Sequence, residues 1–302
     1  MEGKKMKIGL IDVDSHNFPN LPLMKISAWH KAQGDEVEIA NNFLKYDRVY
    51  QAKVFTFSPD ENTYINAKEI IKGGTGYDIK NLLPAEIEKA FPDYSLYPNH
   101  EGSAYGFMTR GCPNNCGFCI VTPKEGRKSY RVAEVKDFWN GQKEIKILDA
   151  NLTASPDALE IIRELKGTKA WIDFTQGLDI RLMTEEMAHE IQQLKLKMMH
   201  FAWDGEKQEK TIKAQLKKYR KYWTHDDRRL RVYVLVNYGT THEYDLERIY
   251  KIKEMGYDPF VMIYEKATAD KRTRQLARWC NNKYIFRACA EFKDYWKKGA
   301  KK

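Results

Sequence analysis

Three cysteines close together in the sequence are the residues best suited to chemistry. Cys112, Cys116 and Cys119 lie within the segment RGCPNNCGFC, residues 110–119. Cysteine thiolates bind metal ions and hold iron–sulfur clusters, which normally take four of them. Because only three lie together here, a four-iron cluster would keep one iron without a protein ligand, open to a small chelating molecule. The spacing therefore predicts a 4Fe–4S cluster held by these three residues.

Two other uses of the cysteines remain open. A zinc-stabilised binding protein would need a fourth ligand, and the remaining cysteines, Cys280 and Cys289, lie far along the chain. A non-catalytic iron–sulfur electron carrier would be expected to be small and to supply every ligand of its cluster. We expect Cys280 and Cys289 to be ordinary core or helix residues. The odd total of five cysteines, three of them clustered, is unlike a secreted disulfide scaffold.

The first 92 residues predict a small α/β domain with a Rossmann-like parallel sheet. Short apolar or alternating stretches predict strands, and the segments between them predict helices. Strands that alternate with helices imply a parallel sheet. The expected strands are residues 7–12, 36–40, part of 48–57, and 69–74, and the expected helices are residues 22–33 and 84–91.

A second α/β domain is expected over residues 104–290, after a linker at 93–103 and before a basic tail at 291–302. Six strands alternate with helices in it, which predicts a barrel or an incomplete barrel. One helix is expected to begin at Pro156 with Ser155 as its N-cap and Gly167 just past its end. Other helices are expected from Thr184, over 209–223 and after Thr241. The expected strands are residues 105–109, 145–150, 170–175, 199–203, 231–236 and 259–264.

Polar side chains follow the ends of these predicted strands, where the reactive groups of such folds lie. Any one of them can equally be a helix N-cap or a loop residue. Their recurrence from strand to strand favours a shared site. They are Asp149, Asn151, Gln176, Asp179, Arg181, Asp204, Asn237 and Glu265.

The cysteine motif resembles the signature of the radical S-adenosylmethionine superfamily, CxxxCxΦC with Φ aromatic. Here it reads Cys112-Pro-Asn-Asn-Cys116-Gly-Phe-Cys119. The resemblance implies a partial (βα)6 barrel in which S-adenosylmethionine chelates the fourth iron through its amino and carboxylate groups. It also implies that one electron splits the sulfonium, giving methionine and a 5′-deoxyadenosyl radical that abstracts hydrogen from a substrate. A cobalamin-dependent or methylthio-type transferase, with RNA as a candidate substrate, is the subsidiary version.

The resemblance also implies roles for individual residues. Phe118 is expected to help cradle the adenine of S-adenosylmethionine. Members of the superfamily often carry Gly-Gly-Glu after the second strand, to bind the methionine amine. This sequence has LDANL there, so Asp149 and Asn151 are expected to substitute. The candidates for ribose, carboxylate or substrate contacts are Gln176, Asp179, Arg181 and Asn237.

The chain as a whole resembles the subgroup with an N-terminal cobalamin-binding-like domain. The motif of that domain is DxHxxG, and the sequence has Asp14 and His16 but Pro19 in place of the glycine. The resemblance therefore implies a domain of related shape, residues 1–92, that has lost cobalamin.

Charge and hydropathy set further expectations. The formal net charge is +9, and residues 205–231 hold ten Lys or Arg against four Asp or Glu. Such a surface can attract nucleic acid, but charge runs are more often a solvated helix face, which is therefore the favoured interpretation beside a nucleic-acid partner. The sequence contains no long apolar run and no signal peptide, which predicts a cytoplasmic protein without a membrane span. The resemblance implies an electron donor such as a flavodoxin or ferredoxin.

Overall fold

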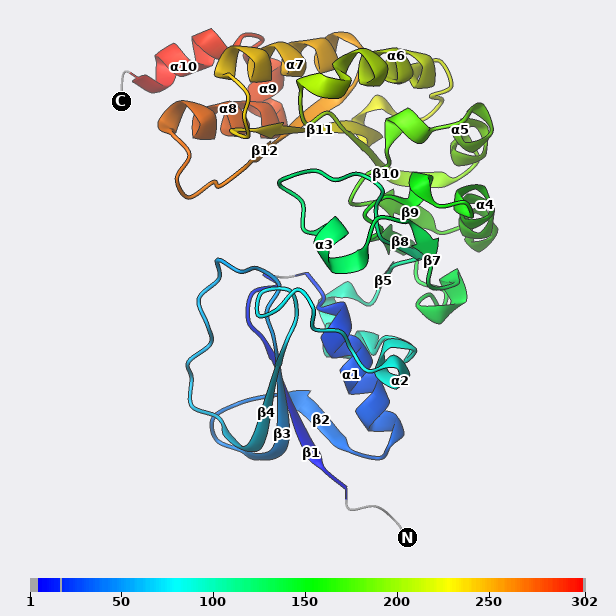
Figure 1. The fold of residues 1–302 in the computed structure, drawn as a ribbon, viewed down its shortest axis with the longest axis vertical. Helices are drawn as coiled ribbons and strands as arrows, with labels where there is room; N and C mark the ends of the chain where they lie inside the picture. The colour runs from blue at the N-terminus through cyan, green and yellow to red at the C-terminus, as the bar shows by residue number, and fades with distance from the viewer. Residues whose placement is uncertain (1–4, 17, 301–302) are drawn as a thin grey trace. The chain divides into compact units, whose positions relative to one another are not determined.

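The computed structural model describes residues 5–16 and 18–300. It contains two compact units, both built around β-strands with flanking helices (Figure 1). One unit comprises residues 1–106 and 133–145, and the other comprises residues 107–132 and 146–302. The domain limits expected from the sequence, 1–92 and 104–290, stay a prediction beside this division.

The first unit contains a four-stranded parallel sheet in the order β2-β1-β3-β4. β1 pairs on one side with β2, where Ile8 lies opposite Val37, and on the other with β3, where Leu10 lies opposite Tyr50. The parallel sheet expected from the sequence is therefore confirmed. The strands are β1 (Lys7–Asp12), β2 (Glu36–Ile39), β3 (Lys45–Ala52) and β4 (Asn66–Gly73).

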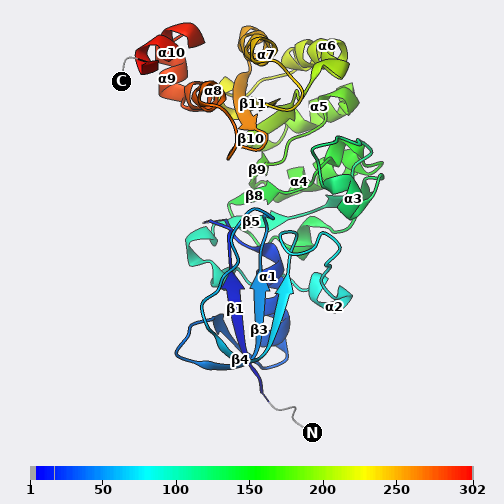
Figure 2. The ribbon, with the colours of Figure 1, turned by 60° about the vertical axis from the view of Figure 1, so that its left-hand side comes forward.

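Helix α1 (Leu21–Ala32) packs its apolar face on this sheet (Figure 2). It begins after Asn20, whose side-chain oxygen accepts a hydrogen bond of 3.3 Å from the backbone N–H of Leu23. The short helix α2 (Ala85–Glu88) adds Ile87 to the same core. The buried core residues are Ile8, Leu10, Leu23, Ile26, Tyr50, Ala52 and Ile87.

Part of residues 48–57 was expected to be a strand, and β3 stops at Ala52 within that range. The reason is the buried carboxylate of Asp14, which accepts hydrogen bonds from the backbone N–H groups of Val54 at 2.7 Å and Phe55 at 2.8 Å. These donors are thereby withdrawn from the strand pairing that a longer β3 would need.

The segment 93–103 is ordered by hydrogen bonds within the first unit. It forms two 3-10 turns, η1 (Tyr94–Leu96) and η2 (Pro98–His100). The backbone N–H of Asp93 donates to the carbonyl of Met24 at 3.1 Å, and the Tyr97 hydroxyl donates to Asp12 Oδ2 at 2.6 Å.

A six-stranded sheet has the order β12-β11-β10-β9-β8-β5. Its first two strands along the chain are β5 (Ser103–Gly106) and β8 (Glu144–Ile147). Strands β9 to β12 pair in parallel, and the two end strands do not pair with each other among the described residues. The sheet is therefore open, and the partial barrel stays a prediction. The remaining strands are β9 (Trp171–Phe174), β10 (Lys195–Ala202), β11 (Leu230–Val236) and β12 (Asp258–Ile263).

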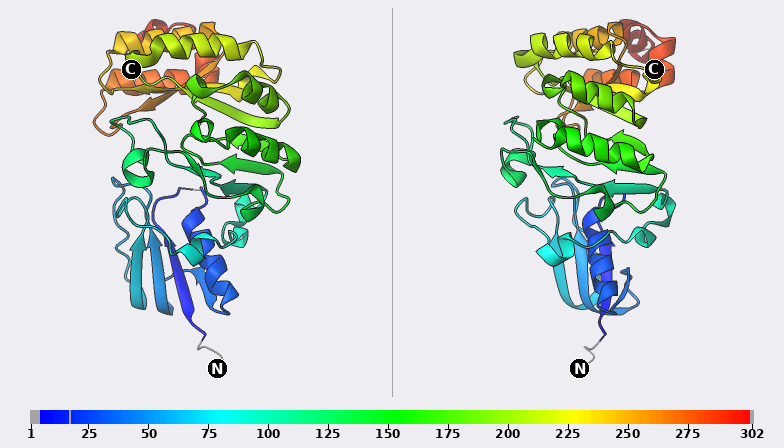
Figure 3. Two further views of the ribbon diagram at one scale, coloured as in Figure 1. Left: turned by 45° about the vertical axis from the view of Figure 1, so that its right-hand side comes forward. Right: turned by 90° about the vertical axis from the view of Figure 1, so that its right-hand side faces the viewer.

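Helices alternate with these strands in the second unit (Figure 3). The expected starts of two helices are confirmed: the hydroxyls of Thr184 and Thr241 accept hydrogen bonds from the N–H groups of Met187 and Tyr244. No helix in the described part of the chain is long and apolar enough to cross a bilayer. The helices are α3 (Val121–Glu125), α4 (Ala158–Thr168), α5 (Glu185–Gln192), α6 (Glu209–Arg220), α7 (His242–Glu254), α8 (Lys271–Asn281), α9 (Lys283–Ala288) and α10 (Phe292–Ala300).

The predicted limits of helix α4 were wrong at both ends. Ser155 is not its N-cap, because its hydroxyl accepts from the backbone N–H of Asp157 at 3.2 Å and closes a turn before the helix. Gly167 lies inside the last turn, and Lys169 takes the left-handed conformation that ends the helix, with φ of 58°.

Candidate cluster-binding site

The cysteine loop does not continue directly from a strand of the large sheet. The expected strand 105–109 is divided into β5 and a separate two-residue strand, β6 (Thr109–Arg110), which pairs antiparallel with β7 (Tyr130–Arg131). The division is explained by Asp149, which was expected to bind cofactor. Its buried carboxylate accepts the backbone N–H groups of Met108 at 2.8 Å and Thr109 at 2.6 Å, and the Thr109 hydroxyl at 2.6 Å. These groups are therefore bound to a side chain rather than to a neighbouring strand.

Burial raises the pKa of Asp149 to about 6, against the hydrogen bonds from Thr109 and Met108 that favour its ionised form. Of the roughly four lone-pair directions of a carboxylate, three are already taken. In this structure Asp149 therefore fixes the segment before the cysteine loop.

Backbone contacts fold the loop against the chain that follows it. The N–H of Cys112 donates to the carbonyl of Gly126 at 3.2 Å, and the N–H of Gly111 donates to Glu125 Oε2 at 3.0 Å. Gly111 has φ of 83°, and a Cβ atom there would lie 2.0 Å from the carbonyl oxygen of Lys128. Only glycine combines this conformation with so close an approach.

The three cysteines lie close enough to influence one another. Cys112 is buried, Cys116 and Cys119 are half-buried, and none of them forms a disulfide. Burial raises the pKa of the Cys116 thiol, and the negative charge of Asp204 and the two neighbouring thiols raise it further. A bound metal centre would offset this repulsion, because cations stabilise thiolates.

Two sulfur atoms receive hydrogen bonds from nitrogen. The Asn151 side-chain amide donates to Cys112 Sγ at 3.4 Å, and the backbone N–H of Val121 donates to Cys119 Sγ at 3.5 Å. Such donors stabilise cluster thiolates and tune the reduction potential. The predicted site residue Asn151 is thus placed beside a predicted ligand.

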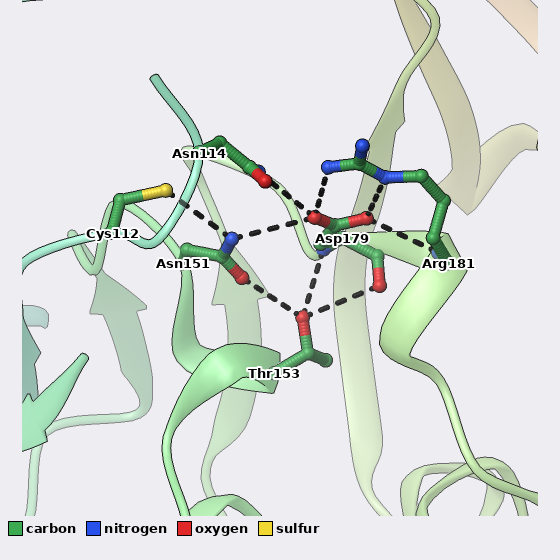
Figure 4. A network of polar contacts seen from close by, with 6 residues as sticks. All are labelled: Cys112, Asn114, Asn151, Thr153, Asp179 and Arg181. Carbon is green, nitrogen blue, oxygen red and sulfur yellow. Dashed lines mark hydrogen bonds and ion pairs between the residues drawn. The ribbon is translucent and has the colours of Figure 1, made fainter. Parts of the chain in front are cut away.

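A polar network centred on Asp179 joins three loops (Figure 4). Its Oδ2 accepts from the side-chain amides of Asn114 at 3.0 Å and Asn151 at 3.4 Å, and Arg181 donates Nε to its Oδ1 at 2.7 Å. The Thr153 hydroxyl donates to Asn151 Oδ1 at 3.1 Å and accepts the backbone N–H of Asp179 at 2.9 Å. The structure therefore brings the predicted residues Asn151, Asp179 and Arg181 together with the cysteine loop.

The network carries a fixed ion pair. Burial opposes ionisation of Asp179, but the hydrogen bonds from Arg181 and Asn114 outweigh it, so the pKa of this carboxyl is lowered. Arg181 donates hydrogen bonds to the Asp179 carboxylate from Nε and from one terminal nitrogen. Its remaining N–H donors are available to an anionic group of a ligand.

An aromatic series extends from the loop to the ends of β11 and β12. The ring of Phe118 meets that of Tyr238 edge to face at 5.2 Å, and Tyr238 meets Tyr264 at 4.8 Å. The exposed Asn237 donates its amide to the carbonyl of Tyr264 at 2.9 Å, and has φ of 67°. The predicted residue Phe118 thus lies beside the end of β11, as Asn237 does, whereas Gln176 is exposed after β9.

The donor set fits a cluster better than one ion. In the described part of the chain, no three His, Cys, Asp or Glu side chains converge closely enough to hold a single metal ion. In a 4Fe–4S cube each thiolate binds a different iron, so its ligands lie further apart than those of one zinc ion. Three free cysteines lie in this one loop, and two of their sulfur atoms receive N–H donors, which is a donor set that a cluster can use.

The other cysteines and the N-terminal motif do not add ligands to this arrangement. Cys280 is buried in α8 beside the carbonyl of Pro259, and burial raises its pKa to about 12. Cys289 lies at the C-cap of α9. Asp14 of the DxH motif is bound to backbone in the first unit, and His16 is exposed with φ of 42°. The resemblance to cobalamin-binding domains is not confirmed.

Three residues of the site were missed at the level of sequence. Asn114, Thr153 and Tyr238 were not among the predicted site residues. Asn114 and Thr153 are polar residues beside predicted ones, and Tyr238 directly follows Asn237. A search one or two residues around each predicted position would have found all three, since Asn114 lies two residues from Cys112 and from Cys116.

Comparisons with known proteins give partial matches. No protein-family model matches the chain. A segment of 117 residues, 36% of the chain, is 31% identical to a CDK5RAP1-like protein of Oryza sativa subsp. japonica. Similar solved structures are those of Streptococcus suis SuiB bound to S-adenosylmethionine (TM-score 0.40, 14% identity, 70% of this chain) and SuiB bound to precursor peptide SuiA (TM-score 0.43, 12% identity, 77% of this chain). The matches span 19% of the rice protein and 52% and 55% of the SuiB chains.

Proposed function

We propose that this protein is a radical S-adenosylmethionine enzyme that binds a 4Fe–4S cluster through Cys112, Cys116 and Cys119. The observation that carries the proposal is one loop with three free, mutually close thiols, two of which accept N–H donors. When bound, such a cluster supplies the electron that splits the sulfonium of S-adenosylmethionine. The proposal includes a partial (βα)6 barrel formed by the open six-stranded sheet.

The protein's own residues hold and orient the small molecule. Arg181, fixed by Asp179, offers N–H donors to the carboxylate of the methionine group. Asn151 donates to the Cys112 sulfur and so orients a cluster ligand. The rings of Phe118 and Tyr238 offer an apolar edge to the adenine. Gln176 and Asn237, exposed at strand ends, are assigned to the ribose or the substrate.

The test is anaerobic reconstitution with iron and sulfide, followed by reductant and S-adenosylmethionine, with 5′-deoxyadenosine as the product measured. The wild-type protein is expected to form it, and Cys116→Ala is expected to lose both the cluster and the product. Cys289→Ala is the matched control, because this cysteine lies at the end of α9, outside the loop. Product formation by Cys116→Ala at the wild-type rate would refute the site. A complete cluster that never gives 5′-deoxyadenosine would instead favour a non-catalytic electron carrier.

A further inference from the structure

The chain that follows the cysteine loop is strongly basic. Residues 120–131 hold Lys124, Arg127, Lys128 and Arg131 against a single acid, Glu125. Glu125 pairs with Arg110, and Arg131 pairs with acids of α4. Arg127 and Lys128 are exposed and have no ion-pair partner in the described part of the chain. Two unneutralised cations therefore face solvent here.

The backbone that carries these two residues runs directly beside the start of the cysteine loop. The carbonyl of Lys128 approaches Gly111 so closely that a Cβ atom there would be 2.0 Å away. Next to it, the N–H of Cys112 bonds to the carbonyl of Gly126 at 3.2 Å. No side chain fits between the surface segment and the residue that precedes Cys112.

Apolar side chains are exposed in the same segment. Ile120 directly follows Cys119 and is 51% exposed, and Tyr130, two residues after Lys128, is 49% exposed. Exposed apolar groups with adjacent cations are typical of surfaces that bind acidic proteins transiently.

We propose that Arg127 and Lys128, with Ile120 and Tyr130, form the docking surface for a small acidic protein that carries one electron. The inference rests on the proposed function, because a cluster at the cysteine loop needs a reductant. The carrier gives up one electron and the cluster gains it, with no bond made or broken and no proton moved. Electron transfer slows steeply with distance, so a donor has to approach where the polypeptide over the cluster is thinnest.

The larger basic region on α6 is a less suitable docking surface. Several of its cations are already neutralised, since Lys213 pairs with Glu209 and Lys218 pairs with Glu185. Its exposed and unpaired Lys217 and Lys221 lie at the C-terminal end of the helix. Because α6 follows a strand of a parallel sheet, that end returns toward the N-terminal edge of the sheet, opposite the strand ends near the cysteines.

The test compares two charge reversals of equal size in the reconstituted holoprotein. Arg127→Glu/Lys128→Glu alters the proposed surface, and Lys217→Glu/Lys221→Glu is the matched control. Cluster reduction is followed as loss of visible absorbance after stopped-flow mixing with a reduced acidic flavodoxin, and separately with dithionite. Binding of oxidised flavodoxin is measured by titration without turnover.

At low salt we expect the first variant to react with flavodoxin about ten-fold more slowly or worse, and to bind it more weakly. The control is expected to stay within about three-fold, and both variants should match the wild type with dithionite. High salt should reduce the difference between the wild type and the first variant in the rate of cluster reduction by flavodoxin, because salt screens the charges. Arg127→Gln/Lys128→Gln should fall between, which tests the charge effect without reversal.

Equal rates for the two reversed variants would overturn the docking surface while leaving the enzyme assignment intact. Failure of the wild-type chain to assemble any cluster would instead overturn the proposed function.

Discussion

Replacing Asp149 by alanine should destabilise the segment that leads into the cysteine loop. Its carboxylate accepts two backbone N–H groups, of Met108 and Thr109, and the Thr109 hydroxyl, at 2.6–2.8 Å. Met108 and Thr109 are fully buried, so in Asp149→Ala no water replaces the lost acceptor. At about 1–3 kcal/mol for each of the two unsatisfied N–H groups, with the hydroxyl free to turn elsewhere, the loss is about 2–6 kcal/mol.

The decrease in stability is partly offset, because the substitution also removes the cost of burying a charged carboxylate. Burial raises the pKa of Asp149 to about 6, so the ionised carboxylate is itself costly to bury. We therefore expect a net loss of about 2–4 kcal/mol in the free energy of unfolding. Asp149→Asn keeps one acceptor oxygen and should lose about half as much.

Urea unfolding followed by tryptophan fluorescence measures the change in the free energy of unfolding. The iron content after reconstitution measures the effect of the substitution on the cysteine loop. Asp157→Ala is the control, since the side chain of Asp157 makes no capping hydrogen bond to α4. An Asp149→Ala protein within about 0.5 kcal/mol of this control, with full iron content, would show that the carboxylate does not hold the segment.

Three further perturbations test other parts of the structure. Gly111→Ala places a Cβ atom 2.0 Å from the carbonyl of Lys128, so the loop has to shift; iron per chain should fall well below wild type, and unchanged iron would contradict the geometry. Burial lowers the pKa of His200 from 6.5 to about 4, so the unfolded chain binds this proton first as the pH falls. Stability should drop by up to about 3 kcal/mol between pH 6.5 and 4, and in His200→Asn this part of the pH dependence of urea unfolding should disappear. Arg248→Met leaves the carboxylate of Asp245 buried and unpaired, and should lower the free energy of unfolding in urea by about 3–5 kcal/mol. A decrease below about 1 kcal/mol would refute the claim that Arg248 compensates this buried charge.

The parts of the fold that depend on local sequence were predictable. The apolar stretches at 7–12 and 231–236 are strands β1 and β11, because a buried parallel strand needs a short apolar run. The starts of α5 and α7 were expected at Thr184 and after Thr241, and both threonines cap their helices through contacts within four residues. The cysteine spacing is equally local, so the candidate ligands were found without the structure.

The remaining features depend on contacts between distant residues. Asp149 was expected to face a cofactor, but it binds backbone groups some 40 residues away and ends a strand there. Asp14 shortens β3 in the same way. Thr153 entered the site through its contact with Asp179. No pattern of period or spacing encodes such pairings, because each arises only once the elements have packed.

The open iron is the central feature of the account, and electron paramagnetic resonance tests it directly. The spectrum of the reduced, reconstituted wild-type protein would be recorded with and without S-adenosylmethionine. Three cysteine ligands leave one iron free to bind the amino and carboxylate groups of S-adenosylmethionine. Adding S-adenosylmethionine should therefore change the g-values of the reduced cluster. A 4Fe–4S signal that stays the same at saturating S-adenosylmethionine would contradict an open iron held by Cys112, Cys116 and Cys119.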